Sequence, residues 1–392
     1  MKKKLFLAMV LLPVLILSCQ KVQPPEGKKD GQARKEGAMQ AESVEQKTED
    51  QSKREVQRPV SQEPKGQSEL QVQLSNPQDP KREKKEVSLA SQPNPLTEDE
   101  QKLVDKIGKN ILIAPSEYFD SQEDAAQYLK VLLKGDHRNI RLYKGYEALR
   151  EDERKQDYDE AMSKAVMSLN PNTKEGLQLI IEVLKTKRDY PMSLSEGAKA
   201  VKVSQDKSVI PLLRQVVKSP SLKVRLEAGG SLLALGDAET ALPVLDELTK
   251  EGATSALGFI YHDMKGKKWE QRGIESIRKA LTYDNNESKA LAALFLIGLT
   301  QKGVIKEDTR RFEDILIKIS EDILNKKTWP ISSHGYSDHR ALETVILAFG
   351  ELESKRAIPV LRRISEHPDA SYLKRRAEET VKYLSKQGGN LK

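Results

Sequence analysis

A short aliphatic-proline motif recurs along the second half of this 392-residue chain. Its copies are VIPLL at 209–213, ALPVL at 241–245 and AIPVL at 357–361, and the first two prolines lie 32 residues apart. Around each copy, apolar residues recur at three- and four-residue intervals, and no segment alternates as a strand would. A period of roughly 30 residues with two helices per unit is typical of a helical solenoid. We therefore predict an all-α fold, an α-solenoid of stacked antiparallel helix pairs.

Residues at the expected helix ends fit this pattern. A proline is tolerated in the first turn of a helix, where its missing N–H has no partner, so each motif copy predicts a helix start. Gly236 and Gly350 follow apolar runs and are expected to end helices in the left-handed conformation. Asp237 and Asp338 are then placed to cap the helices that follow.

Two adjacent glycines, Gly229 and Gly230, stand inside one predicted helix. Each costs about 1 kcal/mol relative to alanine in a helix interior. We expect a compensating close approach of a neighbouring helix at this point.

The stretch LKVRLEAGGSLLALGDAETALPVLDEL, residues 222–248, resembles the short HEAT repeats of the phycobilisome-lyase type. In that family the second helix of a repeat carries an arginine and ends at Leu-Gly-Asp. The first helix of the following repeat begins with Ala-aliphatic-Pro. The resemblance implies a HEAT-like, armadillo-like solenoid over residues 205–388, strongest at 205–300 and 338–386. Residues 96–204 are predicted to be helical too, either as divergent repeats or as an N-terminal cap.

The chain opens with three lysines and a run of about a dozen apolar residues that ends at Ser18, the layout of a secretory signal. The only cysteine of the chain, Cys19, follows directly. The sequence around it resembles the bacterial lipoprotein signal, which implies cleavage after residue 18 and acylation of Cys19. Two or three acyl chains would hold the protein firmly in a bilayer. Gln20 in place of Asp favours the outer over the inner membrane.

Two other interpretations of Cys19 stay open. It is either an ordinary buried cysteine or part of a signal-anchor helix that is never cut. With one cysteine the chain cannot form an internal disulfide.

Residues 19–95 are predicted to be a disordered tether. From Gln20 to Pro95 there is no Phe, Tyr or Trp, whereas there are 13 Gln, 8 Pro, 14 Lys plus Arg and 13 Asp plus Glu. Such a composition cannot bury enough apolar surface to offset the entropy of the chain. The segment is either a spacer, reaching on the order of 50 Å on average, or a segment that binds the cell wall or a partner.

The charge of the chain argues against nucleic-acid binding. The net charge is +7, but the leader carries +3 and the tether +1, which leaves +3 for residues 96–392. That excess is small for a region of this size, and export would also remove the protein from cytoplasmic DNA and RNA.

No motif predicts an enzyme. The sequence contains no phosphate loop, nucleophile elbow or Rossmann glycine pattern, and we predict no catalytic, cofactor-binding or metal-binding residue and no small-molecule substrate. His334 and His339 flank Asp338 and could begin a metal site, but no further ligand is visible nearby. Some HEAT-repeat enzymes hold iron through His-Glu pairs, and this sequence has no His-Glu dipeptide.

Four aromatic residues near predicted helix ends are candidates for a recognition surface: Tyr261, His262, Trp269 and Trp329. Aromatic side chains are enriched at binding hot spots. The alternative is that they serve local packing.

These observations predict a lipoprotein of the cell envelope whose solenoid is a protein-binding scaffold and not an enzyme. Its partners would be the lipid bilayer, through acylated Cys19, and a protein not yet identified. The alternatives are an envelope enzyme with a metal or hydrolytic site in the solenoid's concavity and a spacer protein that binds the cell wall.

Overall fold

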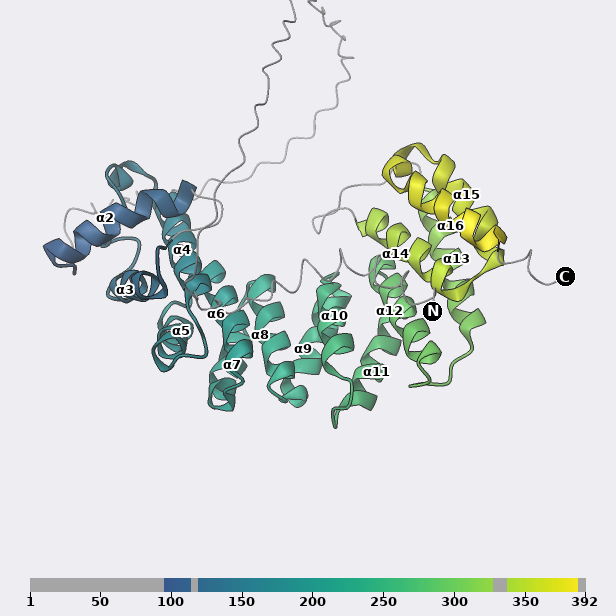
Figure 1. The fold of residues 1–392 in the computed structure, drawn as a ribbon, viewed down its shortest axis with the longest axis horizontal. Coiled ribbons are helices and arrows are strands. Elements are labelled where there is room, and N and C mark those ends of the chain that lie inside the picture. The colour runs from purple at the N-terminus through teal and green to yellow at the C-terminus, as the bar shows by residue number, and fades with distance from the viewer. Residues whose placement is uncertain (1–94, 114–118, 327–336, 387–392) are drawn as a thin grey trace, which may run out of the picture. The chain divides into compact units, whose positions relative to one another are not determined.

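In the computed structural model, the described residues are 95–113, 119–326 and 337–386. They form 15 α-helices joined by turns and short 3-10 segments, and no strand occurs within these residues (Figure 1). The all-α solenoid predicted from the sequence is confirmed. Cys19 and the leader and tether around it lie outside the described residues.

Helix α2 (Glu98–Ile113) precedes seven consecutive pairs in the described part of the chain. The pairs are α3 (Gln122–Leu133) with α4 (Glu151–Ser168), α5 (Lys174–Thr186) with α6 (Pro191–Ser204), α7 (Ile210–Val216) with α8 (Leu222–Ala234), α9 (Ala238–Lys250) with α10 (Ser255–Asp263), α11 (Glu270–Ala280) with α12 (Asn286–Gln301), α13 (Thr309–Leu324) with α14 (Ser337–Leu352), and α15 (Ile358–Glu366) with α16 (Lys374–Lys386). We call the first helix of each pair an A helix and the second a B helix.

The 3-10 segments lie in the connections between these helices. They are η2 (Tyr146–Ala148), η3 (Lys207–Val209), η4 (Lys355–Ala357) and η5 (Pro368–Leu373).

The two helices of each pair pack against each other, and each B helix also packs on the B helix of the next pair, from α4 through α16. Contacts between equivalent helices recur at an offset of 33 residues. On the B side, Ser231 donates to the carbonyl of Ala198 over 2.7 Å. On the A side, Lys279 Nζ lies 3.5 Å from a carboxylate oxygen of Asp246. This offset is the structural counterpart of the 32-residue spacing in the sequence.

Helix stacking continues across residue 204, where the resemblance to HEAT repeats begins. Helix α4 packs on α6, and α6 packs on α8, as in the later repeats. The buried residues on both sides of this point, such as Val201 and Val224, belong to one hydrophobic cluster. The stack therefore contains both motif-bearing and motif-poor helices.

The three motif prolines do not occupy equivalent positions. Pro211 and Pro359 lie in the first turn of α7 and α15, each after a 3-10 segment, as predicted. Pro243 lies inside α9, which already begins at Ala238, so the prediction of a helix start is wrong for this copy. Here the first turn is α-helical instead of 3-10, and Pro243 is exposed.

Only one of the two predicted glycine helix ends is present. Gly236 has φ +96° and ends α8. Gly350 lies within α14, which continues to Leu352, and the left-handed residue after this helix is Glu353, with φ 51°. The prediction for Gly350 is wrong because α14 is one turn longer than the apolar pattern indicated.

The two aspartates predicted as caps form ion pairs, Asp237 with the preceding repeat and Asp338 within its own repeat. Asp237 occupies the N-cap position of α9, but its carboxylate accepts from Arg214 of α7, over 2.8 Å to Nε and 3.1 Å to Nη2. Asp338 lies within the first turn of α14 and accepts from Lys326 over 2.7 Å. Both carboxylates are buried and therefore need these cationic partners.

Candidate protein-binding surface

The aromatic residues singled out in the sequence separate into two environments. Tyr261 and His262 lie on B helix α10 and remain accessible, whereas Trp269 is buried, with 7% of its surface exposed. Trp269 directly precedes α11, and its ring packs beside Gly273 of that helix, so it serves local packing. Trp329 and His334 lie outside the described residues.

The glycine pair of α8 positions α10. A Cβ on Gly230 would lie 2.8 Å from the ring of Phe259, and one on Gly229 would lie 3.1 Å from the side chain of Leu245. The expected close approach is therefore confirmed, with α10 on one side and α9 on the other. Because α8 carries no side chain at Gly230, the Phe259 ring lies directly against its backbone.

Tyr261 and Phe295 form the centre of the exposed cluster. Their rings stack in parallel, with centroids 4.1 Å apart and an interplanar angle of 6°. His262 meets the Tyr261 ring edge-on, with centroids 5.4 Å apart. Both stacked rings are half-buried, so part of each ring remains accessible to a partner.

Two lysines border the cluster. Lys302, at the end of α12, donates to the Tyr261 hydroxyl over 3.0 Å, and its Nζ lies 5.4 Å from the ring centroid. On the other side, Lys202 of α6 places its Nζ 5.2 Å from the Phe259 ring and 3.3 Å from a carboxylate oxygen of Asp263. We call Lys202, Phe259, Tyr261, His262, Phe295 and Lys302 the aromatic surface.

Partial burial lowers the pKa of His262 below its usual value, because desolvation disfavours the charged imidazolium. The carboxylate of Asp263 opposes this effect, and Lys202 and Lys302 add to it. The lowered pKa favours the neutral imidazole, so the positive charge of the aromatic surface resides mainly on its two lysines. Such a surface offers ring faces, a hydroxyl and ammonium groups, which suits contact with protein side chains.

The sequence indicated Tyr261 and His262 but missed the other four members of the aromatic surface, Lys202, Phe259, Phe295 and Lys302. Tyr261 and Phe295 belong to two different repeats, with the whole of α11 between them in the sequence, so no local pattern reveals their contact. Only the repeat offset of about 33 residues, applied to Tyr261, points to the neighbourhood of Phe295.

A groove lies on the A side, between α9 and α11. It has a volume of about 770 Å³ and is lined by Leu242, Pro243, Asp246, Lys279 and Tyr283, among others. The Lys279–Asp246 ion pair crosses it, and Arg272 pairs with Glu239 at the same offset. These pairs make the groove a seam between repeats that is crossed by ion pairs.

The possible metal site around His339 does not assemble in the described residues. The His339 ring stacks on Tyr372 with centroids 5.2 Å apart, while the neighbouring Asp338 is paired with Lys326. Among the described residues, no group of three or more His, Cys, Asp or Glu side chains is arranged to hold a metal ion.

A buried lysine that the sequence did not indicate lies in the connection between α5 and α6. Lys187 is 6% exposed, and its Nζ donates to the carbonyl oxygens of Leu132, over 3.3 Å, and of Gly135. Burial lowers its pKa to about 8. Its Nζ also lies 5.6 Å from the ring centroid of Tyr158 and 6.0 Å from that of Tyr190. The ammonium group caps the C-terminal end of α3, where the last carbonyls have no partner within the helix. Lys187 therefore has a structural role.

None of the helices in the described residues combines the length and the apolar composition needed to cross a bilayer. Comparison of the chain with family models, with curated proteins and with solved structures gave no match.

Proposed function

We propose that this chain is a lipoprotein of the cell envelope, anchored through acylated Cys19, whose solenoid binds a partner protein through the aromatic surface. The outer membrane is the proposed address, because Gln20 follows the cysteine. The tether between Cys19 and the first helix would let the solenoid reach a partner away from the lipid.

One observation carries the binding role: two half-exposed rings of adjoining B helices stack on each other, and lysines border the cluster that they form. Aromatic side chains that are already ordered lose little conformational entropy on binding, and they contribute most to hot spots. Lys302 and Lys202 hold the rings of Tyr261 and Phe259 in place before a partner arrives. The surface is therefore prepared for binding in a way that a row of independent exposed side chains is not.

Site-specific cross-linking tests this function in intact cells. A photo-crosslinking amino acid at His262, which is exposed at the edge of the aromatic surface, is expected to capture a discrete protein. The matched control carries the same amino acid at Lys250, which is also exposed but lies at the end of A helix α9.

The capture at position 262 should weaken when Phe295→Ala is introduced in the same chain. The same products at both positions, or none at position 262, would count against the aromatic surface as the binding site.

A further inference from the structure

The interface between the α9–α10 pair and the α11–α12 pair differs from its neighbours on the B side. Helix α10 has nine residues, whereas the other B helices of the described chain have 13 to 18. Helices α12 and α14 pack on each other extensively, but α10 and α12 are the least closely packed of all successive B helices in the described residues. Because each repeat is held mainly by its nearest neighbours, this interface is a weak point of the stack.

On the A side of the same interface, the groove of about 770 Å³ lies between α9 and α11. Two ion pairs bridge it, Lys279 with Asp246 and Arg272 with Glu239. The two cationic side chains are 61% and 46% exposed, so solvent screens both pairs and they contribute little to holding the helices in one position. The groove therefore leaves space into which α9 and α11 can move.

One edge of the interface is fixed by buried hydrogen bonds. Ser288 Oγ donates to the carbonyl of Thr249 over 3.0 Å, and Thr254 Oγ1 donates to a carboxylate oxygen of Glu287 over 2.9 Å. These residues lie at the end of α9, in the connection to α10 and in the first turn of α12, which all belong to the A-to-B edge of the solenoid. Breaking such bonds would leave desolvated polar groups without partners, so this edge acts as a fixed point.

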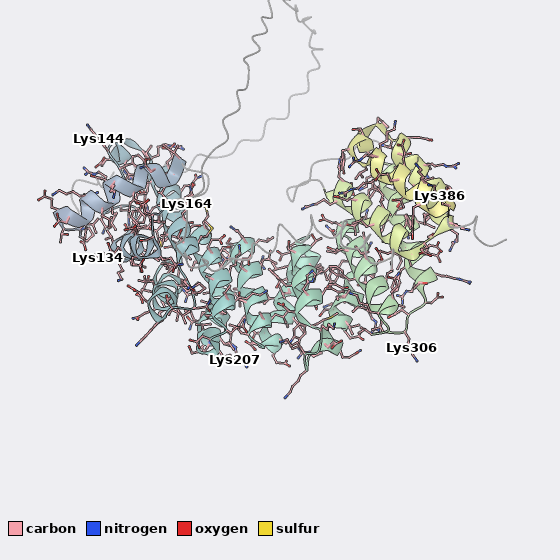
Figure 2. The ribbon with its side chains drawn as sticks, in the orientation of Figure 1. Lys134, Lys144, Lys164, Lys207, Lys306 and Lys386 are labelled. Carbon is pink, nitrogen blue, oxygen red and sulfur yellow. The ribbon has the colours of Figure 1, made fainter. Side chains whose placement is uncertain are left out.

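The other edge of the interface is closed by exposed contacts. Because successive helices alternate in direction, the B-to-A connections lie on this edge, and Figure 2 shows Lys207 and Lys306, from the connections after α6 and α12, on the same side of the molecule. Toward this edge the repeats meet through the stacked rings of Tyr261 and Phe295, and Lys302 donates to the Tyr261 hydroxyl. A ring stack of this kind is of modest strength and breaks without burying an unpaired polar group.

We propose that this interface, which we call the joint, is a hinge at which the solenoid bends. The buried bonds lie between the two layers of helices, because Thr249 belongs to an A helix and Ser288 to a B helix. Rotation about them closes the groove between α9 and α11 while it separates α10 from α12, and the reverse rotation does the opposite.

The joint passes through the aromatic surface, because Tyr261 lies on one side of it and Phe295 on the other. A partner that contacts both rings would therefore hold the joint at one angle. The hinge itself goes beyond the proposed protein-binding function and does not depend on it.

Distances between pairs of spin labels, measured by pulsed electron paramagnetic resonance, test the joint. The chain from residue 20 to 392 contains no cysteine, so only introduced cysteines are labelled. Lys250→Cys with Asp322→Cys places the labels in the last turns of α9 and α13, on either side of the joint. Lys185→Cys with Lys250→Cys is the matched control, because it spans the same number of repeats, from α5 to α9, without crossing the joint. All three positions are exposed.

We expect the distribution of distances across the joint to be about twofold wider than that of the control pair. Equal widths for the two pairs would overturn the proposal. Neither result depends on a partner or on Cys19, so the proposed function is tested separately.

Variants of the bridging contacts locate the motion. Arg272→Glu removes the ion pair with Glu239 and is expected to widen the distribution between positions 250 and 322, and the further change Glu239→Arg should restore it. Arg356→Glu, which breaks an ion pair with Glu313 at the interface of the last two repeats, should have no effect on this distribution.

Phe295→Ala removes the ring stack and should also widen the distribution across the joint, but not that of the control pair. Circular dichroism shows whether the helices of each variant are intact. A wide distribution that responds to neither Arg272→Glu nor Phe295→Ala would place the motion between α11 and α13 and refute the joint.

Discussion

Lys202 of α6 contacts Phe259 of α10, although α8 stands between these two helices in the stack. The lysine Nζ lies 5.2 Å from the centroid of the Phe259 ring and 3.3 Å from a carboxylate oxygen of Asp263 on the same helix. Both α6 and α10 pack on α8, and Gly230 of α8 leaves the space in which the Phe259 ring lies. Lys202 thus reaches past the adjacent repeat to the one after it, because α8 has no side chain at Gly230.

Replacing Gly230 with alanine is expected to destabilise the solenoid. The new Cβ would lie 2.8 Å from the Phe259 ring, and overpacking of this kind costs about 1–3 kcal/mol, more than the roughly 1 kcal/mol that alanine gains by its helix propensity. Urea unfolding followed by circular dichroism measures the difference. The control is Gly258→Ala in α10, where nothing lies within 4 Å of the new Cβ, so stability should rise by up to ~1 kcal/mol. The same sign for both variants would contradict the close approach.

The stacked rings of Tyr261 and Phe295 are expected to stabilise each other. A double-mutant cycle of Tyr261→Ala and Phe295→Ala should give a coupling energy of about 0.5–1.5 kcal/mol, because parallel rings 4.1 Å apart interact beyond the area they bury. Unfolding free energies of the two single variants and the double variant provide the measurement. Additive effects would mean that the stack does not persist in solution.

The stability of the N-terminal repeats should increase as the pH rises from 8 to 9. The folded chain lowers the pKa of Lys187 to about 8, whereas an unfolded lysine titrates near ~10.4. Between these values the unfolded state binds more protons, so the unfolding free energy grows with pH, by about 2 kcal/mol from this group. Near pH 10 the trend reverses, because burial raises the pKa of Tyr190 to about 12 and also raises that of Tyr128, Tyr143, Tyr146 and Tyr158, so that only the unfolded tyrosines ionise.

Lys187→Met isolates that contribution. The variant should lose most of the rise between pH 8 and 9 in urea unfolding experiments, whereas Lys250→Met, at an exposed lysine, should retain it. An unchanged slope in Lys187→Met would show that the lysine is not buried as described.

Cys19→Ala should release the protein from the membrane-pelleted fraction of cells into the soluble fraction, or leave a longer chain that retains its leader. The physical reason is that two or three acyl chains bind a bilayer far more firmly than one, and a chain without any has no such attachment. Immunoblotting of fractions, with mass spectrometry of the N-terminal peptide of the native protein, checks this. Unaltered membrane association of a correctly cleaved Cys19→Ala protein would refute the lipid anchor.

Local features of the sequence were sufficient to predict the class of fold. The spacing of apolar residues predicted helices, and the 32-residue spacing of two prolines predicted repeats, because both patterns depend on contacts that each repeat forms in the same way. Positions that depend on the length of a particular helix were less predictable. Gly350 and Pro243 match their motif copies in sequence, but the helices around them extend one turn further than in the other repeats.

The aromatic surface could be predicted only in part, and the reason is its long-range origin. Tyr261 and His262 were noticeable as aromatics near a helix end, but Phe295 and Lys202 acquire their roles from helices one and two repeats away. No local pattern distinguishes Lys202 or Lys187 among the 66 lysines and arginines of the chain.

The sequence by itself determined that this chain forms paired helices in series, since amphipathic periodicity and helix-end residues act within a few turns of the backbone. Tertiary structure alone decided which side chains meet between repeats, which carboxylates are neutralised and which lysines stay unpaired. Those outcomes depend on the distance and angle between stacked helices, and these are set by packing at residues such as Gly230, far along the chain from the groups they bring together.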